Sequence, residues 1–398
     1  MMKNGVGYTI VNVVNTISPL LLIPLISNLY GVDSLGVYFA ISLIVGVCFL
    51  IIDYSFFLIS NRYSEYPSEI LYKNIQSARL ILLIICGLFT TVALLVYGVE
   101  LIEVFSVLTT LTLYSMFPTW YFLLNSKIKL LIVSNFAVRL LPFVSVTLFY
   151  YLSSYNYFGV LENYNSKYLI VHLIFLSQSI AYFLVTPFTF KTFKFSFSGG
   201  KSVLNDGWQL FVADFFPNLY NNFPIIFLSY VSSPQSFASF NVGNRVIAGI
   251  NSLYYSFSRG VLPLVKGIVG DANFVRVVRV VSVFSSLVIS IVIIMLSKHI
   301  VNFFIGFDSA DAVFILQYMA LSLPFSVINL MYFNFFVVPQ SLDKYYRRFI
   351  VKFSVFFCFI SIFAIMNYQI YGMAIVLLIS RVSLAIYSIF DETRRSRR

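Results

Sequence analysis

Long apolar stretches separated by short polar breaks follow one another along almost the whole chain. A transmembrane helix needs about 20 consecutive, predominantly apolar residues. Windows of that length predict about twelve spans, at residues 8–29, 35–60, 78–98, 101–125, 130–152, 168–190, 206–231, 237–263, 278–297, 312–337, 349–367 and 369–390. Only 10% of the 398 residues are charged, whereas soluble domains carry about 25%. The chain is therefore expected to be an all-α polytopic membrane protein.

The basic residues predict how these spans are oriented. With the N-terminus in the cytoplasm, only Lys167 and Lys298 fall in outer loops, and four arginines lie deep within spans, at least four residues from either end. The rest of the 26 Lys and Arg residues lie on the cytoplasmic side, as the positive-inside rule predicts. We therefore expect both termini in the cytoplasm. Loops that face an anionic leaflet explain the net charge of +11, so no nucleic-acid partner is expected.

The spans divide into two sets of six. We predict an N-terminal six-helix lobe over 1–190, a cytoplasmic linker over 191–205 and a C-terminal six-helix lobe over 206–398. The linker contains Gly200-Lys201-Ser202, the end of a phosphate-loop motif. Phe195 stands where that motif needs a glycine, and no strand precedes it, so we reject a nucleotide site.

The first span of each lobe is interrupted by prolines, Pro19 and Pro24 in one and Pro217 and Pro224 in the other. Interrupted helices at matching positions of two halves point to a transport site between them, although prolines are also common in membrane helices generally. The loops are too short to hold a catalytic domain, so we expect a transporter and not an enzyme. The three cysteines have no spacing typical of a disulfide or metal site, and no cofactor is expected.

Polar side chains share one face on three of the predicted spans, when the residues are projected at 100° each. The residues concerned are Asn12 on the first span, Asp214, Asn218 and Asn221 on the seventh, and Asn241, Asn244, Arg245 and Arg259 on the eighth. Within hydrocarbon such faces must meet other helices or water. One polar face is explained equally well by hydrogen bonds between helices, but three together predict a shared aqueous cavity.

Six charged residues lie deep inside predicted spans, at least four residues from either end, and each costs about 2.5–3.5 kcal/mol to insert on the lenient scale. They are Asp53, Arg139, Asp214, Arg245, Arg259 and Arg381. The surplus of arginine favours an anionic substrate, because the guanidinium fork suits phosphate oxygens. We predict that the arginines and the asparagines bind substrate, and that the two aspartates act in coupling to H⁺ or another cation, or in gating. Snorkelling of Arg259 and ion pairs between helices are the structural alternatives.

Three segments resemble the Wzx-type O-antigen flippases. The run from Asn28 to Tyr38, NLYGVDSLGVY, followed by Asp53 in IIDYSF, resembles the opening of that family. The stretch FNVGNRV at 240–246, followed by RGVLP at 259–263, resembles its eighth span, and YGMA at 371–374 resembles the start of its last span. The family usually has Phe-Gly where this chain has Tyr54-Ser55.

The resemblance implies membership of the multidrug/oligosaccharidyl-lipid/polysaccharide (MOP) exporter superfamily, with a MATE-like, V-shaped architecture. It also implies translocation of undecaprenyl-diphosphate-linked repeat units, by alternating access, from the cytoplasmic to the periplasmic leaflet of a bacterial inner membrane, in lipopolysaccharide biosynthesis. Arg245 and Asp53 carry over by position. The implied partners are the lipid-linked oligosaccharide, inner-membrane lipids, and polymerase and chain-length regulator proteins.

Two other functions remain open. An O-antigen polymerase has similar length and composition, but typically carries a large outer loop with catalytic arginines, whereas the outer loops here are short. A multidrug exporter of the same superfamily matches in span number, but the positive surplus within the spans disfavours cationic drugs. The lipid II flippases of the superfamily usually have two further spans.

Overall fold

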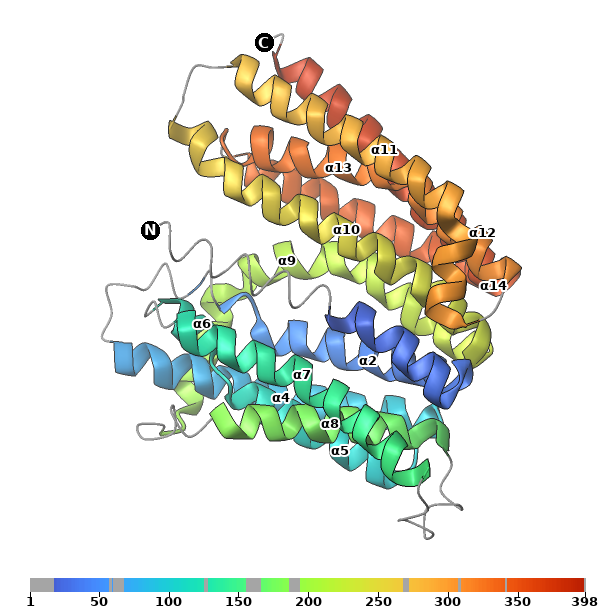
Figure 1. The fold of residues 1–398 in the computed structure, drawn as a ribbon. Helices are drawn as coiled ribbons and strands as arrows, with labels where there is room; N and C mark the ends of the chain where they lie inside the picture. The colour runs from blue at the N-terminus through green and yellow to red at the C-terminus, as the bar shows by residue number, and fades with distance from the viewer. Residues whose placement is uncertain are drawn as a thin grey trace. The chain divides into compact units, whose positions relative to one another are not determined.

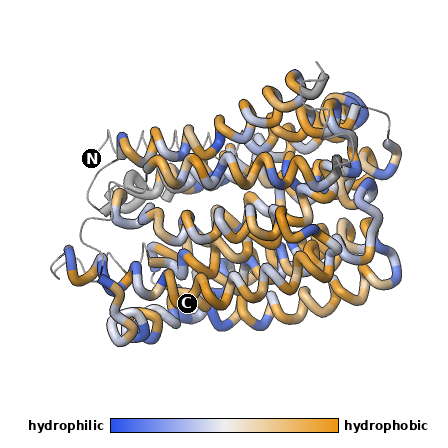
Figure 2. Tube along the Cα trace, turned by 90° about the horizontal axis from the view of Figure 1, so that it is seen from below, coloured by the Kyte–Doolittle hydropathy of each residue, from blue (hydrophilic) through white to orange (hydrophobic). Residues whose placement is uncertain are grey.

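The computed structural model describes residues 18–56, 59, 68–124, 128–154, 166–185, 194–267, 272–306, 309–340 and 342–396. Regular secondary structure in these ranges is entirely helical, which confirms the predicted fold class (Figure 1). The chain forms two compact units, Met1–Asn218 and Leu219–Arg398. Hydrophobic residues line the bodies of the helices, and hydrophilic residues gather toward their ends (Figure 2).

The first unit is a helical bundle in which α2, α5 and α7 all pack against α8. Helix α4 packs on α2 and α5. The helices of this unit are Ser18–Tyr30, α2 (Val32–Asp53), α4 (Ser68–Val96), α5 (Leu101–Met116), α6 (Thr119–Leu124), α7 (Ile128–Ser154), α8 (Ser166–Val185) and the first part of α9 (Phe197–Val231). Gly98, with φ of 81°, makes the tight turn between α4 and α5, a conformation that favours glycine.

The second unit packs α10 on α12, α11 on α12 and α13, and α13 on α14. Its helices are the end of α9, α10 (Pro234–Gly267), α11 (Ala272–Ile305), α12 (Ala310–Leu321), α13 (Leu323–Tyr332), the π-helical turn η3 (Phe333–Val337) and α14 (Asp343–Ser396). The backbone of Gln369, with φ of 47° and ψ of −126°, divides α14 into two helices.

Each of the twelve predicted spans corresponds to helical structure in the part of the chain that is described. Seven of the described helical segments are long and apolar enough to cross a membrane, and one of them, within α14, contains the last two predicted spans. Two shorter helical segments are also apolar: the helix Ser18–Tyr30 and residues Tyr168–Leu184 of α8. The many Asn and Ser residues of α9 and α10 lower their hydropathy. The protein is thus a multi-pass membrane protein.

Some predicted helix ends are wrong. The second span was expected to run to residue 60, but α2 ends at Asp53 because Tyr54 and Ser55 have φ values of 41° and 55°. Helix α4 begins at Ser68, well before the predicted start at residue 78. Helix α9 begins at Phe197, so the second half of the predicted linker, including its Gly-Gly-Lys-Ser sequence, is helical.

Candidate functional site

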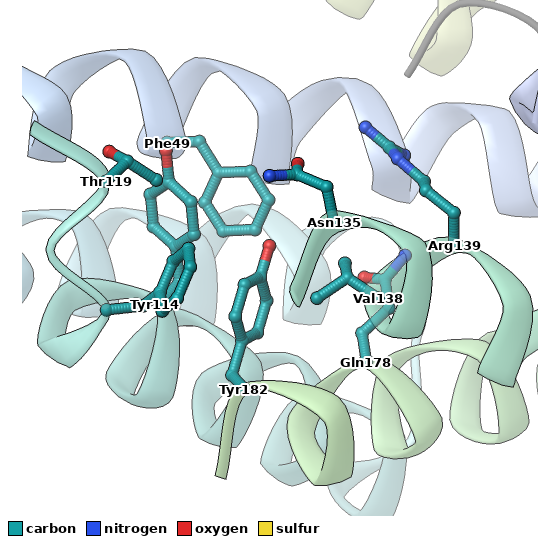
Figure 3. Close-up of a pocket in the computed structure, with 9 residues that line it drawn as sticks. Phe49, Tyr114, Thr119, Asn135, Val138, Arg139, Gln178 and Tyr182 are labelled. Carbon is teal, nitrogen blue, oxygen red and sulfur yellow. The ribbon is translucent and has the colours of Figure 1, made fainter. Parts of the chain in front are cut away.

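The first unit contains a cavity of about 250 Å³ between α2, α5, α6, α7 and α8 (Figure 3). Its lining residues are Phe49, Tyr114, Phe117, Thr119, Asn135, Val138, Arg139, Gln178 and Tyr182. Helical spacing explains how two helices supply most of the polar groups. Asn135 and Arg139 lie one turn apart on α7, and Gln178 and Tyr182 one turn apart on α8, so each pair shares a face.

The cavity combines one cation, two amides, hydroxyl groups and aromatic rings. The Asn135 amide and the Tyr182 hydroxyl point into the same space, beside the Phe49 ring (Figure 3). The Phe49 and Tyr114 rings are stacked with their centroids 3.9 Å apart. Among the described residues that line the cavity, none is a carboxylate. These walls offer hydrogen-bond donors and one positive charge, which together suit an anionic or hydroxyl-rich group.

Asp53 lies in an ion-pair cluster next to this cavity. One carboxylate oxygen of Asp53 accepts a hydrogen bond of 2.5 Å from the Tyr114 hydroxyl, and the other lies 3.4 Å from Nη2 of Arg79. The same Nη2 donates to the Tyr114 carbonyl at 2.9 Å. Because Tyr114 also lines the cavity, one side chain joins the ion pair to the cavity wall.

The end of α2 is positioned by α9. Tyr54 directly follows Asp53, and its ring stacks on Phe211 of α9 with centroids 4.3 Å apart and planes 10° apart. The Tyr54 hydroxyl donates to the Leu204 carbonyl at 2.9 Å. A non-glycine residue in the left-handed region costs about 1–2 kcal/mol, so these contacts offset the strain of ending α2 there.

Arg79 was not predicted as a site residue, because it stands at the cytoplasmic end of the third predicted span and was counted with the basic residues of that side. In the structure α4 starts ahead of it, and its side chain is completely buried. A signal for the longer helix is present in the sequence: Leu71, Ile75, Ala78 and Leu82 are spaced for one helical face, and all four are buried. Tyr114, Tyr182, Asn135 and Gln178 were also missed, since nothing in their local sequence distinguishes them from other residues of membrane helices.

The predicted site residues are divided between the two units. Arg139 lines the cavity of the first unit, and Asn218 and Asn221 are half-buried on α9. Asn12 lies outside the described residues, as do the side chains of Asp214 on α9 and Arg259 on α10. The assigned roles of all these residues remain predictions.

In the second unit, Asn241 is buried within its own bundle, and its side-chain amide donates to the Phe237 carbonyl at 3.0 Å. Asn244 and Arg245 are half-buried on α10. Arg381 on α14 donates through Nη1 to the Ser322 hydroxyl at 2.5 Å. The structure therefore brings Asp53 and Arg139 into one unit and Asn241, Asn244, Arg245 and Arg381 into the other.

A second carboxylate cluster lies near the end of α14. Asp391 accepts a hydrogen bond of 2.6 Å from the Tyr332 hydroxyl and one of 2.9 Å from Nε of Arg395. Arg279 of α11 pairs with Glu392 beside it. Within the described residues, no group of three or more His, Cys, Asp or Glu side chains is placed to hold a metal ion.

The fold and cavity define a helical, multi-pass membrane protein with a polar cavity inside its first unit. No protein-family model and no curated protein matches the chain. Solved structures do match. The lipid II flippase MurJ in an inward closed conformation is 18% identical with a TM-score of 0.68, over 99% of this chain and 88% of that one.

Two further structures extend the comparison. An inward-facing multidrug resistance MATE family transporter of the MOP superfamily is 14% identical with a TM-score of 0.60, over 98% of this chain and 94% of that one. A MOP superfamily transporter from Pyrococcus furiosus is 11% identical with a TM-score of 0.58, over 98% of this chain and 94% of that one. At these identities the comparison establishes the fold: the chain has the fold of MurJ and the MATE transporters.

Proposed function

We propose that the protein is a transporter that moves undecaprenyl-diphosphate-linked O-antigen repeat units from the cytoplasmic to the periplasmic leaflet by alternating access. The supporting observation is the composition of the cavity in the first unit, which has Arg139, two amides and tyrosine hydroxyls but no carboxylate among its described lining residues. The likeness in fold to MurJ, a lipid II flippase, supports the same substrate class.

The chemistry of the cavity fits one part of such a substrate at a time. The Arg139 guanidinium can bind two phosphate oxygens through its fork, while Asn135 and Gln178 can both donate to and accept from sugar hydroxyls. Sugar rings pack on aromatic faces, which Phe49 and Tyr114 provide. Pockets for whole small ligands are about 300–1,000 Å³. A cavity of about 250 Å³ therefore suits a phosphate or a single sugar ring, with the rest of the substrate outside it.

A multidrug exporter is the second candidate. The likeness in fold to a MATE transporter and the aromatic lining of the cavity favour it. A cationic drug would be expected to pair with a carboxylate. The carboxylate beside the cavity, Asp53, is already paired with Arg79, so we rank this function second.

The first test is a clean deletion in the source bacterium, followed by analysis of lipid-linked glycan in each membrane leaflet. We expect complete repeat units to accumulate in the cytoplasmic leaflet. The wild type and the control Arg276→Ala, whose side chain is exposed on α11, should restore export, whereas Arg139→Ala should not. Single units that still reach the outer leaflet, with only chain length lost, would instead identify a polymerase. Unchanged glycan with increased drug sensitivity would identify an exporter.

We place the protein in the bacterial inner membrane with both termini in the cytoplasm, on the distribution of Lys and Arg. Partners from the same biosynthetic machinery, a polymerase and a chain-length regulator, follow from the proposed substrate. Co-purification of the tagged protein from cross-linked inner membranes tests this association.

A further inference from the structure

Two of the three cysteines meet inside the first unit, although 38 positions separate them in the sequence. Cys48 on α2 is 0% exposed and Cys86 on α4 is 1% exposed. The Cys48 sulfur lies 3.9 Å from the Cys86 carbonyl oxygen, and the Cys86 sulfur lies 3.8 Å from the Cys48 carbonyl oxygen. A hydrogen bond also joins the two thiol groups. The two sulfurs therefore face each other where α2 packs on α4.

A hydroxyl group lies against one of these sulfurs. A single buried cysteine usually acts only as a small apolar residue, but here Oγ1 of Thr90 is 3.1 Å from the Cys48 sulfur. Thr90 is one turn after Cys86 on the same face of α4, and it is also fully buried. A hydroxyl can donate to a sulfur and stabilise the negative charge that develops when the thiol reacts. Cys48 is thus placed to react first, with Cys86 beside it as the second thiol.

The surroundings of the pair determine which oxidant reaches it. Neither cysteine side chain is open to water, which shields both from charged, water-soluble oxidants. On the neighbouring face of α4, Ile85 is 58% exposed and Leu88 is 68% exposed. An exposed apolar face of a membrane helix contacts lipid tails, which are as apolar as these side chains. Organic hydroperoxides dissolve in the same apolar layer, so they approach the pair from the lipid across the width of one helix.

The pair is also next to the cavity. Phe49 directly follows Cys48 on α2, lines the cavity and stacks on Tyr114. The ion pair between Asp53 and Arg79 joins the same two helices further along their contact. A covalent bond at Cys48 therefore fixes the turn of α2 that carries the Phe49 wall of the cavity.

We propose that Cys48 and Cys86 are a site of reversible oxidation, at which a lipid-soluble hydroperoxide forms a disulfide that ties α2 to α4. The Cys48 sulfur attacks the hydroperoxide, the O–O bond breaks, and the thiol proton leaves with the alcohol, so that Cys48 becomes a sulfenic acid. The Cys86 sulfur then attacks the Cys48 sulfur, the S–S bond forms, and the Cys86 proton leaves with the hydroxyl group as water. The two thiols lose two electrons, and the hydroperoxide is reduced to alcohol and water.

The bond is detected by treating the full chain in lipid nanodiscs with cumene hydroperoxide, blocking the remaining thiols and digesting without reductant for mass spectrometry. We expect one peptide pair that is linked through Cys48 and Cys86 and is separated by dithiothreitol. Oxidised glutathione at the same concentration should form the link at least about tenfold more slowly, because exchange needs access to the sulfur. Absence of the link in the folded wild type would overturn the inference, and so would equally fast linking by oxidised glutathione.

Three variants test the role of each group. Cys86→Ala should abolish the link. Thr90→Val keeps the shape of the side chain without the hydroxyl and should slow the link by about tenfold, because a hydrogen bond to developing charge is lost. Cys358→Ala, in the second unit, is the matched control and should link as fast as the wild type. An unchanged rate in Thr90→Val would refute the assignment of Cys48 as the sulfur that reacts first.

The tie between the helices is measured by thermal unfolding. The oxidised wild type should unfold roughly 4–16 °C above the reduced protein, because the bond restricts the unfolded chain. Cys86→Ala should show no shift after the same treatment. Equal Tm values for the oxidised and reduced wild type would overturn the inference that the bond ties α2 to α4.

The effect on transport rests on the proposed function, whereas the disulfide does not. Translocation of a fluorescent polyprenyl-diphosphate disaccharide in proteoliposomes should fall several-fold when the wild type is oxidised and return with dithiothreitol. Cys86→Ala should keep its rate in both conditions. Undiminished translocation by the oxidised wild type would refute control of the cavity by this bond. No translocation by the reduced wild type, with the disulfide still forming, would refute the transport function and leave the oxidation site standing.

Discussion

Gly200 lies where the first turns of α9 cross α4. A Cβ atom added at Gly200 would lie 3.0 Å from the Ala78 nitrogen and 3.1 Å from the Ser77 carbonyl carbon. Both of these atoms belong to the α4 backbone, which cannot rotate away as a side chain can. Next to this crossing, the Ser196 amide donates to the Ser77 hydroxyl at 2.9 Å. Gly200→Ala should therefore push the two helices apart.

The size of the effect follows from comparison with Gly46 on α2, where an added Cβ would meet nothing within 4 Å. Alanine is favoured over glycine within a helix by about 1 kcal/mol, and this gain applies at both positions. Overpacking costs about 1–3 kcal/mol and applies only at Gly200. We therefore expect Gly200→Ala to be less stable than Gly46→Ala by about 1–3 kcal/mol.

Thermal unfolding of the two variants in one detergent is the assay. For a unit of this size, 1 kcal/mol corresponds to about 2–4 °C in Tm, so the two variants should differ by roughly 2–12 °C. Hydrogen–deuterium exchange should locate the loss to residues 194–205 and the facing part of α4. Equal Tm values for the two variants would refute the reasoning, because they would mean that α9 does not approach α4 closely at Gly200.

Three other variants test the remaining contacts. Arg79→Met should cost less stability than Asp53→Asn by about 1–3 kcal/mol in thermal unfolding near neutral pH, because it leaves a half-exposed carboxylate and not a buried guanidinium. Tyr332→Phe removes the hydroxyl that donates to Asp391 and should cost about 1–3 kcal/mol in the same assay, since a buried carboxylate loses one hydrogen bond and keeps only those from Arg395. Arg139→Lys should weaken binding of a fluorescent polyprenyl-diphosphate disaccharide by about tenfold, because lysine cannot bind two phosphate oxygens as a fork. Unchanged binding would show that Arg139 does not contact the phosphate.

Fold class and span positions could be predicted because each depends on many residues. Twenty apolar residues in a row specify a membrane helix whatever their order, and single errors average out. Helix ends depend on few contacts and could not be predicted in the same way. Helix α2 ends at Asp53 because Tyr54 is held by the Phe211 ring and the Leu204 carbonyl, and both lie far along the chain on α9.

The polar face of the eighth predicted span illustrates a second limit. Projection at 100° per residue shows which residues share a face, but not what that face contacts. In the structure Asn241 is buried and bonds to the carbonyl one turn before it. Nearby, Gly243 lies against Ile315 and Leu316 of α12. Gly243 lies on the opposite side of α10 from Asn241, so α10 is covered on both sides there, and the part of the predicted polar face at Asn241 is buried.

Charged residues within spans were the better guide, because burying a charge is expensive enough to need a specific reason. That reasoning singled out Asp53 and Arg139, which lie in the cluster and at the cavity of the first unit. It missed Arg79 because the predicted start of the third span was ten residues too late, which put Arg79 at the cytoplasmic end of that span and not well inside it. Because of the error in this one helix end, the sequence analysis did not identify Arg79 as the ion-pair partner of Asp53.

Counting Arg79 among the charged residues within the membrane spans changes the charge balance from which the substrate was predicted. The sequence count set four arginines within spans against two aspartates, as if Asp53 were available to offset Arg139. In the structure the Asp53 carboxylate pairs with Arg79, while Arg139 lines a cavity with no carboxylate among its described lining residues. The positive charge at the cavity therefore does not depend on the overall surplus of arginine. An anionic group is attracted there even if Arg245, Arg259 and Arg381 serve only to hold the second unit together, and salt should weaken that attraction less than it weakens an exposed ion pair.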